Sequence, residues 1–230
     1  MHDPFLADIA LVKPTSRSRI KICCIQNADE AALAIRYGAS ALGLVSSMPS
    51  GPGVIPEERI AEIARTIPPG VTSVLLTSHV DADSIIEQQR RTGVNALQLC
   101  DRLDEGAHQE LRRKLPGISI IQVVHVTGPE SIDEALSLQN DVDAFLLDSG
   151  RTDLAVKVLG GTGKVHDWGI SRELCSRVAR PVFLAGGLTP ENVGEAVRVV
   201  APYGIDVCTG VRSDGRLDEA KLRRFVAHAV

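Results

Sequence analysis

From residue 19 onward, short apolar runs alternate with longer stretches in which apolar residues recur at helical spacing. The runs that carry a strand pattern, rich in β-branched residues, are Arg19–Ile25, Ala39–Val45, Val71–Thr77, Asn95–Leu99, Ile118–Val126, Asp143–Leu147, Pro181–Ala185 and Gly204–Val207. Helical patterns follow them, for instance Ala28–Tyr37, Pro56–Thr66, Asp81–Thr92, Pro190–Val199 and Leu217–Val230. This alternation is typical of a parallel sheet whose faces are covered by helices.

Strand–helix units of this number and length fit a closed (βα)8 barrel near the small end of its usual size range. The competing architecture is an open doubly wound sheet, whose dinucleotide-binding form needs a glycine-rich turn after the first strand. Here the first strand runs into Cys23-Cys24-Ile25-Gln26-Asn27, which contains no glycine. We therefore predict an α/β fold, a single-domain (βα)8 TIM barrel over residues 19–230, preceded by an N-terminal arm at residues 1–18.

Composition limits the ligands that such a barrel can take. The chain has 25 basic and 29 acidic residues and only 3% aromatic residues, which disfavours nucleic-acid binding. No apolar run approaches the roughly 20 residues of a membrane span. The five cysteines show no Cys-x-x-Cys spacing, which indicates reduced thiols rather than a disulfide framework or a zinc site. We expect a cytoplasmic protein that binds a small molecule, either as a monomer or as a homodimer.

In barrels of this class, the chemistry lies at the carboxyl ends of the strands. Side chains alternate along a strand, so Lys21 and Cys23 share one face, and the charge of a lysine disfavours the face that packs on the apolar helix layer. Both residues are therefore expected in the barrel mouth, where a nearby ammonium favours the thiolate and makes Cys23 a usable general base. The alternative is that Cys23 is a small buried apolar residue. Cys24, on the opposite face, is expected to be a packing residue.

Two aspartates end buried strands. Asp148 follows the apolar run Ala144–Leu147, where a carboxyl group is costly unless it is paired or used. Apolar surroundings would raise its pKa and suit it to general-acid catalysis. The alternative is a capping or turn aspartate, and the same two interpretations apply to Asp206.

Glycine-containing joins follow the last two predicted strands. Gly186 and Gly187 follow the seventh strand, and Cys208, Thr209 and Gly210 follow the eighth. Backbone amides at such joins can approach an anion, and in barrels of this class the loops after strands seven and eight often bind phosphate. A tight strand-to-helix turn is the alternative.

The segment Gly160-Gly161-Thr162-Gly163-Lys164 is not a phosphate-binding P-loop, because Val158 and Val165 stand where glycine and a hydroxyl residue are required. It lies in a long segment after the sixth strand, so we predict an active-site loop. The histidines show no metal-ligand spacing, and no Gly-x-Ser-x-Gly motif supports a serine hydrolase.

Taken in order, these motifs resemble the phosphoribosylanthranilate isomerase family of tryptophan biosynthesis, from Lys21 to the C-terminus. The pieces are Lys21-Ile22-Cys23, Gly38–Gly43, Asn95–Leu99, Leu146–Ser149, Gly160–Lys164 with Asp167-Trp168, Ala185–Val193 and Asp206–Val211. The resemblance implies an Amadori rearrangement of a phosphoribosylated aromatic amine on a (βα)8 barrel, without metal or organic cofactor.

By position, the resemblance implies that Cys23 is the general base and Asp148 the general acid. The implied substrate-binding residues are Lys21, Gln98, Cys100, Asp206 and Arg212. The implied phosphate-binding residues are Gly186, Gly187, Cys208, Thr209 and Gly210. The expected partner is a small phosphorylated sugar substrate.

The chain also departs from the family pattern. Cys24 replaces the glycine of Lys-Ile-Cys-Gly, and Pro52 stands where the family has an arginine that pairs with the anthranilate carboxylate. Cys100 replaces the histidine after Gln-Leu, Arg212 the glutamate after Gly-Val, and His166 an aromatic residue. Either Arg212 or Arg151 supplies the missing cation, or the chain is a paralogue for another phosphorylated sugar or sugar amine. A barrel that binds a phosphorylated ligand without turnover is a third interpretation.

Overall fold

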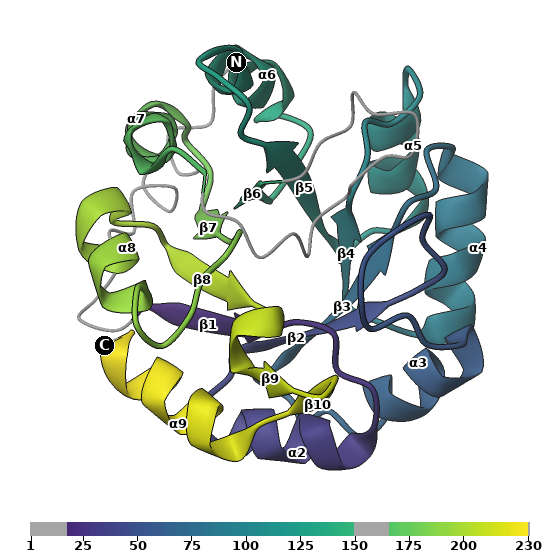
Figure 1. Ribbon diagram of the computed structural model, residues 1–230. Helices are drawn as coiled ribbons and strands as arrows, with labels where there is room; N and C mark the ends of the chain where they lie inside the picture. The colour runs from purple at the N-terminus through teal and green to yellow at the C-terminus, as the bar shows by residue number, and fades with distance from the viewer. Residues whose placement is uncertain (1–17, 150–165, 230) are drawn as a thin grey trace.

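The computed structural model describes residues 18–149 and 166–229 of the protein, and Figure 1 labels its elements. Within these residues, eight parallel strands close into a barrel in chain order. Their bounds are β1 Arg19–Ile22, β2 Ala41–Val45, β3 Thr72–Thr77, β4 Ala96–Leu99, β5 Ser119–His125, β6 Ala144–Asp148, β7 Val182–Leu184 and β8 Gly204–Val207. The predicted (βα)8 TIM barrel is confirmed.

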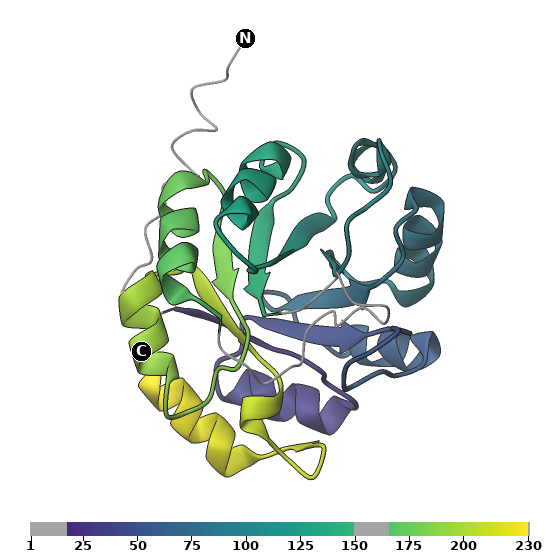
Figure 2. The ribbon, with the colours of Figure 1, turned by 45° about the horizontal axis from the view of Figure 1, so that its top comes forward.

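Helices surround the barrel as an outer ring (Figures 1 and 2). They are α2 Ala28–Arg36, α3 Glu57–Ala64, α4 Ala82–Thr92, α5 Ala107–Lys114, α6 Glu130–Leu138, α7 Trp168–Arg177, α8 Val193–Val200 and α9 Glu219–His228. Between β8 and α9 lie the 3₁₀ turn η1 (Thr209–Val211) and a short hairpin of β9 (Arg212–Ser213) and β10 (Arg216–Leu217). Among the described residues, no helix has both the length and the apolar character needed to cross a bilayer.

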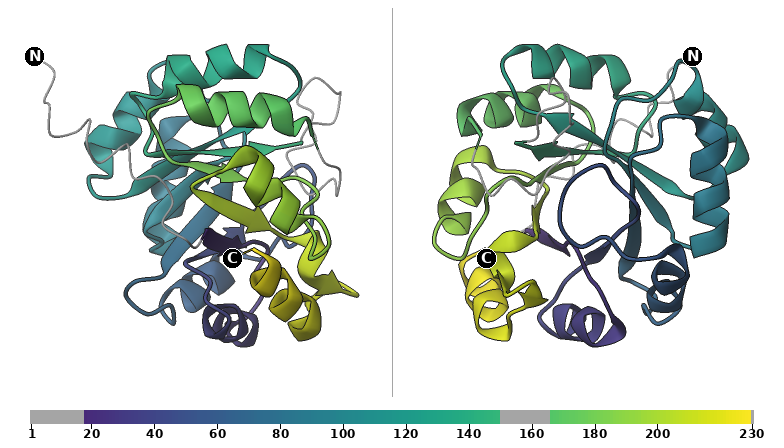
Figure 3. Two further views of the ribbon diagram at one scale, coloured as in Figure 1. Left: turned by 90° about the vertical axis from the view of Figure 1, so that its left-hand side faces the viewer. Right: turned by 45° about the vertical axis from the view of Figure 1, so that its right-hand side comes forward.

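Two apolar layers hold the fold together, and neighbouring strand residues alternate between them. Leu42, Leu75 and Leu97 are fully buried in the layer between strands and helices. Ala41 and Val74, one position earlier, belong to a second layer inside the barrel. The side views of Figure 3 show the strands enclosed by the helices, which is why the strands are apolar on both faces.

Local signals fix where α2 and α4 begin. The side chain of Asn27 caps α2 by accepting a hydrogen bond from the Glu30 amide at 2.9 Å, and Glu30 in return accepts one from the Gln26 amide at 3.1 Å. Asp81 caps α4 by accepting from the Ser84 amide at 2.8 Å.

Several predicted boundaries are wrong by a few residues. The first strand ends at Ile22 rather than Ile25, because Cys24 has a positive φ of 63° that breaks the extended backbone. Helix α8 begins at Val193 rather than Pro190. The Asn192 side chain accepts from the Thr189 amide and donates to the Gly187 carbonyl, which forms a turn before the helix starts.

The division into an arm at residues 1–18 and a barrel at 19–230 stays a prediction. Apart from Ser18, the arm lies outside the described residues, and so do residues 150–165 with the predicted loop Gly160–Lys164 and Arg151.

Candidate active site

A cavity opens at the carboxyl ends of the strands, with an empty volume of about 670 Å³ that includes space open to solvent. Sequence-predicted residues on its wall are Cys23, Gln98, Asp148, Gly186, Gly187, Asp206, Cys208 and Thr209. Sequence-predicted residues that do not line it are Lys21, Cys100, Gly210 and Arg212. The predicted base, the predicted acid and part of the predicted phosphate loops therefore share one cavity.

Lys21 and Asp206 form a buried ion pair where β1 meets β8. The two residues are partners in the parallel register, and Lys21 Nζ lies 2.9 Å from Asp206 Oδ1, with side-chain exposures of 1% and 8%. Burial is the largest single effect and lowers the pKa of Lys21, but the charge and hydrogen bond of Asp206, together with the nearby Cys23 and Cys100, outweigh it, so the pKa of Lys21 is raised. Lys21 is thus a buried charged residue next to Cys23, with its ammonium engaged by Asp206 rather than presented to the cavity.

Cys23 follows β1 and is buried in the apolar layer inside the barrel. Glycine at position 43 of β2 leaves room for it, since a Cβ there would lie 2.8 Å from Cys23 Sγ. Burial raises the pKa of the Cys23 thiol to about 11, although the charge of Lys21 acts in the opposite direction. The expected pairing of thiol and ammonium therefore exists, but burial has the larger effect on the thiol.

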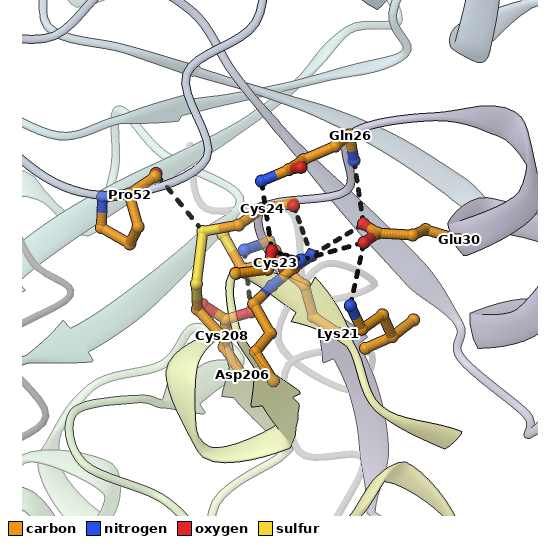
Figure 4. The surroundings of a disulfide bond; sticks show 11 residues. Lys21, Cys23, Cys24, Gln26, Glu30, Pro52, Asp206 and Cys208 are labelled. Carbon is orange, nitrogen blue, oxygen red and sulfur yellow. Dashed lines mark hydrogen bonds and ion pairs between the residues drawn. A yellow bond between two sulfur atoms is a disulfide. The ribbon is translucent and has the colours of Figure 1, made fainter.

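The structure overturns two expectations for the cysteines. Cys24 is not a packing residue on the helix side of the strand: it lines the cavity and forms a disulfide with Cys208 (Figure 4). The thiols of the chain are therefore not all reduced, and only Cys23, Cys100 and Cys175 are free among the cysteines. The pair escapes sequence reasoning because 184 positions separate its members, and barrel closure brings them together.

Asp148 ends β6 and is half-buried at the cavity. Its Oδ1 accepts a hydrogen bond from the Ser149 amide at 2.7 Å. Burial raises the pKa of Asp148, and the hydrogen bond from Ser149 opposes this only in part. The shift is in the direction that general-acid catalysis requires.

The loops after β7 and β8 lie against each other. Gly186 and Gly187 both have positive φ angles, 76° and 64°. A side chain at Gly210 would clash with the carbonyl oxygen of Leu188, so the absence of one allows the two loops to touch. Cys208 precedes η1, and Thr209 begins it. These are the loops that the sequence predicts to bind phosphate.

Of the two predicted residues at the end of β4, Gln98 lines the cavity and Cys100 does not. Gln98 lines the cavity, and its Oε1 is buried without a hydrogen-bond partner within the described structure, so it can accept one from a ligand. Cys100 lies outside the lining, 3.8 Å from Gln98 Nε2, and burial raises the pKa of its thiol. Cys100 therefore contacts Gln98 rather than the cavity.

Arg212 has a position different from the one expected for a substrate-binding cation. It is 7% exposed, and its guanidinium forms an ion pair with Glu30 at 2.9 Å. It also donates to the carbonyl oxygens of Gly215, Cys23 and Cys24. Arg212 thus links the backbone of Cys23 and Cys24 to Glu30 of α2 and to the β9–β10 hairpin.

Sequence reasoning missed the apolar part of the cavity wall, which includes Val45, Met48, Leu76 and Ala185. No signal distinguishes these residues from ordinary core residues in the sequence. Pro52, at the position of the family arginine, also lies on the wall. Within residues 18–149 and 166–229, no group of three or more His, Cys, Asp or Glu side chains is arranged to hold a metal ion.

Comparison with known proteins identifies the family of the chain. The chain matches the family model described as N-(5'-phosphoribosyl)anthranilate (PRA) isomerase over residues 20–228. The chain belongs to this family. The resemblance inferred from the sequence motifs is thereby confirmed.

Two curated PRA isomerases illustrate the relationship. The N-(5'-phosphoribosyl)anthranilate isomerase 2 of Methanosarcina mazei is 43% identical over 213 residues, which cover 92% of this chain and 93% of the relative. The Haloferax volcanii enzyme is 38% identical, with coverage of 92% and 93%. Among solved structures, the phosphoribosyl anthranilate isomerase of Thermotoga maritima aligns with a TM-score of 0.77 and 30% identity over 92% of this chain and 98% of its own.

A further solved PRA isomerase is a complex with reduced 1-(o-carboxyphenylamino)-1-deoxyribulose 5-phosphate, with a TM-score of 0.76 and 27% identity. It covers 92% of this chain and 98% of the solved chain. That family member therefore binds a phosphorylated sugar amine.

Proposed function

We propose that this chain converts N-(5'-phosphoribosyl)anthranilate into 1-(o-carboxyphenylamino)-1-deoxyribulose 5-phosphate, an Amadori rearrangement in tryptophan biosynthesis. One observation carries the proposal: a thiol, Cys23, and a carboxyl group, Asp148, line the same cavity as the glycine loops after β7 and β8. Membership of the PRA isomerase family supports the choice of substrate.

Asp148 begins the reaction as general acid. It donates its proton to the furanose ring oxygen while the C1–O bond breaks and the amine nitrogen forms a double bond to C1. Burial raises the pKa of Asp148, which is the direction that suits a carboxyl group for general-acid catalysis. Proton transfer from a positioned side chain contributes roughly 10²–10⁴-fold to a rate.

Cys23 acts as general base. Its thiolate removes the proton from C2, and the electrons of the C2–H bond form a C1=C2 double bond while the iminium nitrogen becomes an amine. The C2 hydroxyl then loses its proton and C1 gains one, which yields the ketose. All atoms and electrons stay within the substrate apart from exchanged protons, so the reaction needs no redox partner.

The remaining wall positions the substrate. Asp206 is proposed to hold the amine nitrogen, and the amides around Gly186, Gly187 and Thr209 to hold the phosphate ester. Met48 and Leu76 offer an apolar surface to the aromatic ring. We propose that Lys21 and Arg212 act as positioning residues, because the first is paired with Asp206 and the second with Glu30.

The fluorescence of phosphoribosylanthranilate tests the proposal directly, since it is lost as the substrate is converted. The wild-type chain should convert the substrate, and Cys23→Ser and Asp148→Asn should each retain the fold and lose turnover. No turnover by a folded wild-type chain that still binds a phosphate ester would favour the paralogue or the non-catalytic binder. The cytoplasmic location and the choice between monomer and homodimer stay predictions.

A further inference from the structure

The Cys24–Cys208 disulfide joins two loops of the candidate active site. Cys24 follows the predicted base Cys23, and Cys208 precedes η1 in a loop predicted to bind phosphate. Their Cα atoms lie 5.9 Å apart, within the range that a disulfide spans. Both cysteines line the cavity. The bond between them, drawn in Figure 4, therefore connects the side of the site that holds Cys23 to the loop predicted to bind phosphate.

The backbone at Cys24 needs this support. Its φ of 63° lies in the left-handed region, which is strained for an L-residue with a side chain. Arg212 donates to its carbonyl oxygen, and the side chain lies against Gly53, where a Cβ would clash with it. The Cys24 sulfur is also 3.6 Å from the Pro52 carbonyl oxygen. Of these contacts around Cys24, the disulfide alone is covalent, and thiol–disulfide exchange can break and reform it.

We propose that the Cys24–Cys208 disulfide is a redox-modification site that a dithiol reductant reduces. Its redox state controls how tightly the cavity binds phosphate. This inference rests on the proposed function for its effect on turnover. The two sulfurs belong to residues on the wall of a cavity that opens to solvent, and Cys208 is half-buried rather than enclosed. A reducing thiol can therefore approach through the same opening as the substrate.

The dithiol supplies the two electrons and two protons that reduce the Cys24–Cys208 disulfide. One thiolate of the reductant attacks a sulfur of the pair, the Cys24–Cys208 bond breaks, and a mixed disulfide forms. The second thiol of the reductant then attacks the mixed disulfide and displaces the protein cysteine that is still bound in it. Two electrons and two protons pass to the protein, which ends with two thiols, while the reductant ends as a disulfide. A disulfide oxidant such as oxidised glutathione reverses the reaction.

Reduction removes the tether but not the fold. The barrel, the Lys21–Asp206 pair and the Arg212–Glu30 pair do not depend on the disulfide. The loop containing Thr209 is then held to the β1 side by non-covalent contacts alone. We expect weaker phosphate binding, so KM should rise at least fivefold while kcat changes less.

The first measurement counts thiols and follows binding in both redox states. The oxidised protein should show three titratable thiols in denaturant and the dithiothreitol-reduced protein five, since Cys23, Cys100 and Cys175 are free. Isothermal calorimetry with inorganic phosphate should give a Kd at least fivefold higher for the reduced form. Oxidised glutathione should restore both the thiol count and the Kd.

Variants separate the covalent bond from other effects. Cys208→Ser should have the KM of the reduced enzyme and not respond to dithiothreitol. Cys24→Gly provides a second test if that variant fails to fold, because glycine adopts a positive φ without strain. Cys175→Ser is the matched control: Cys175 lies on α7 outside the cavity lining, so this variant should respond to dithiothreitol as the wild type does.

Five titratable thiols after oxidation would overturn the proposal, and so would equal phosphate Kd values for the oxidised and reduced forms. If neither form turns over phosphoribosylanthranilate, the proposed function fails. The redox site is then still decided by the phosphate Kd, with a state-dependent value supporting it and an equal value overturning it.

Discussion

The two proton-transfer groups proposed here stand in differently built surroundings. At the end of β1, Cys23 lies among long-range cross-links: the Lys21–Asp206 pair, the Arg212–Glu30 pair and the Cys24–Cys208 disulfide. At the end of β6, Asp148 accepts a hydrogen bond from the adjacent Ser149 amide, and within the described residues it has no ion-pair partner.

The difference separates two ways of preparing a catalytic group. The base side fixes the position of its thiol through contacts between residues more than 180 positions apart. The acid side needs a high proton affinity, and burial supplies it by raising the pKa of Asp148. Substitutions that break the buried ion pairs of the base side should therefore cost stability, whereas substitutions of Asp148 should cost activity alone.

The largest expected effect is on turnover by Asp148→Asn. We expect kcat to fall roughly a thousandfold, within the range of general acid–base catalysis. The thermal midpoint should stay the same or rise, because an amide avoids the burial cost that raises the pKa of the carboxyl. Steady-state kinetics and thermal unfolding check both statements, and a large drop in the midpoint would contradict the contrast between the two sides.

The next effect is on stability at the base side. Arg212→Ala leaves Glu30 buried without its cation, and breaking a buried ion pair in this way costs about 3–5 kcal/mol. Urea unfolding measures this loss. Arg113→Ala is the control, because the Arg113–Glu110 pair lies on the surface and its loss should leave the unfolding midpoint unchanged. Equal effects of the two variants would show that the Arg212 network does not hold the loop.

The same ion pair predicts a pH dependence. Burial acts to raise the pKa of Glu30, but the hydrogen bonds from Arg212 and from the Leu217 amide outweigh it, so the pKa lies below 4.5. A lowered carboxyl pKa contributes stability that is present above pH 4.5 and is lost as the pH falls through the folded-state value. Denaturant unfolding from pH 6 to 3 should show a steeper loss for the wild type than for Glu30→Gln. Parallel curves would argue against the pair.

The smallest expected effect concerns the backbone beside the acid. In Gly186→Ala, the new Cβ would lie 3.1 Å from Asp148 Oδ1 and 3.0 Å from His166 Nδ1, at a φ of 76°. We expect kcat to fall a few-fold. Gly117→Ala is the matched control, since its φ is 86° and no atom lies within 4 Å of the new Cβ. Both variants should lose similar stability from backbone strain, and only Gly186→Ala should lose activity.

Much of the fold could be predicted because its signals are local. The apolar runs place the barrel strands to within a few residues, and the cap at Asp81 is visible in the sequence itself. The apolar pattern predicts the end of β1 three residues too late. The segment Cys23-Cys24-Ile25 contains no glycine that would indicate the positive φ found at Cys24. The turn of residues 189–192 depends on the Asn192 side chain bonding back to Gly187, which spacing alone does not reveal.

The candidate site was predicted less evenly. Strand alternation correctly placed Cys23 in the barrel interior, and the position of Asp148 after a buried run led to the cavity wall. The same alternation failed for Cys24, whose backbone leaves the strand conformation. Arg212 is expected near the substrate as a candidate for the cation missing at Pro52, but its guanidinium pairs with Glu30 instead.

The sequence by itself determined the order of strands and helices, since apolar periodicity and capping act between neighbours in the chain. It also determined which residue types stand at the strand ends. Only the tertiary structure decided the partners of those residues. Barrel closure sets β1 beside β8 and so joins Lys21 to Asp206 and Cys24 to Cys208. Contacts across the whole length of the chain follow from three-dimensional packing, which no local pattern encodes.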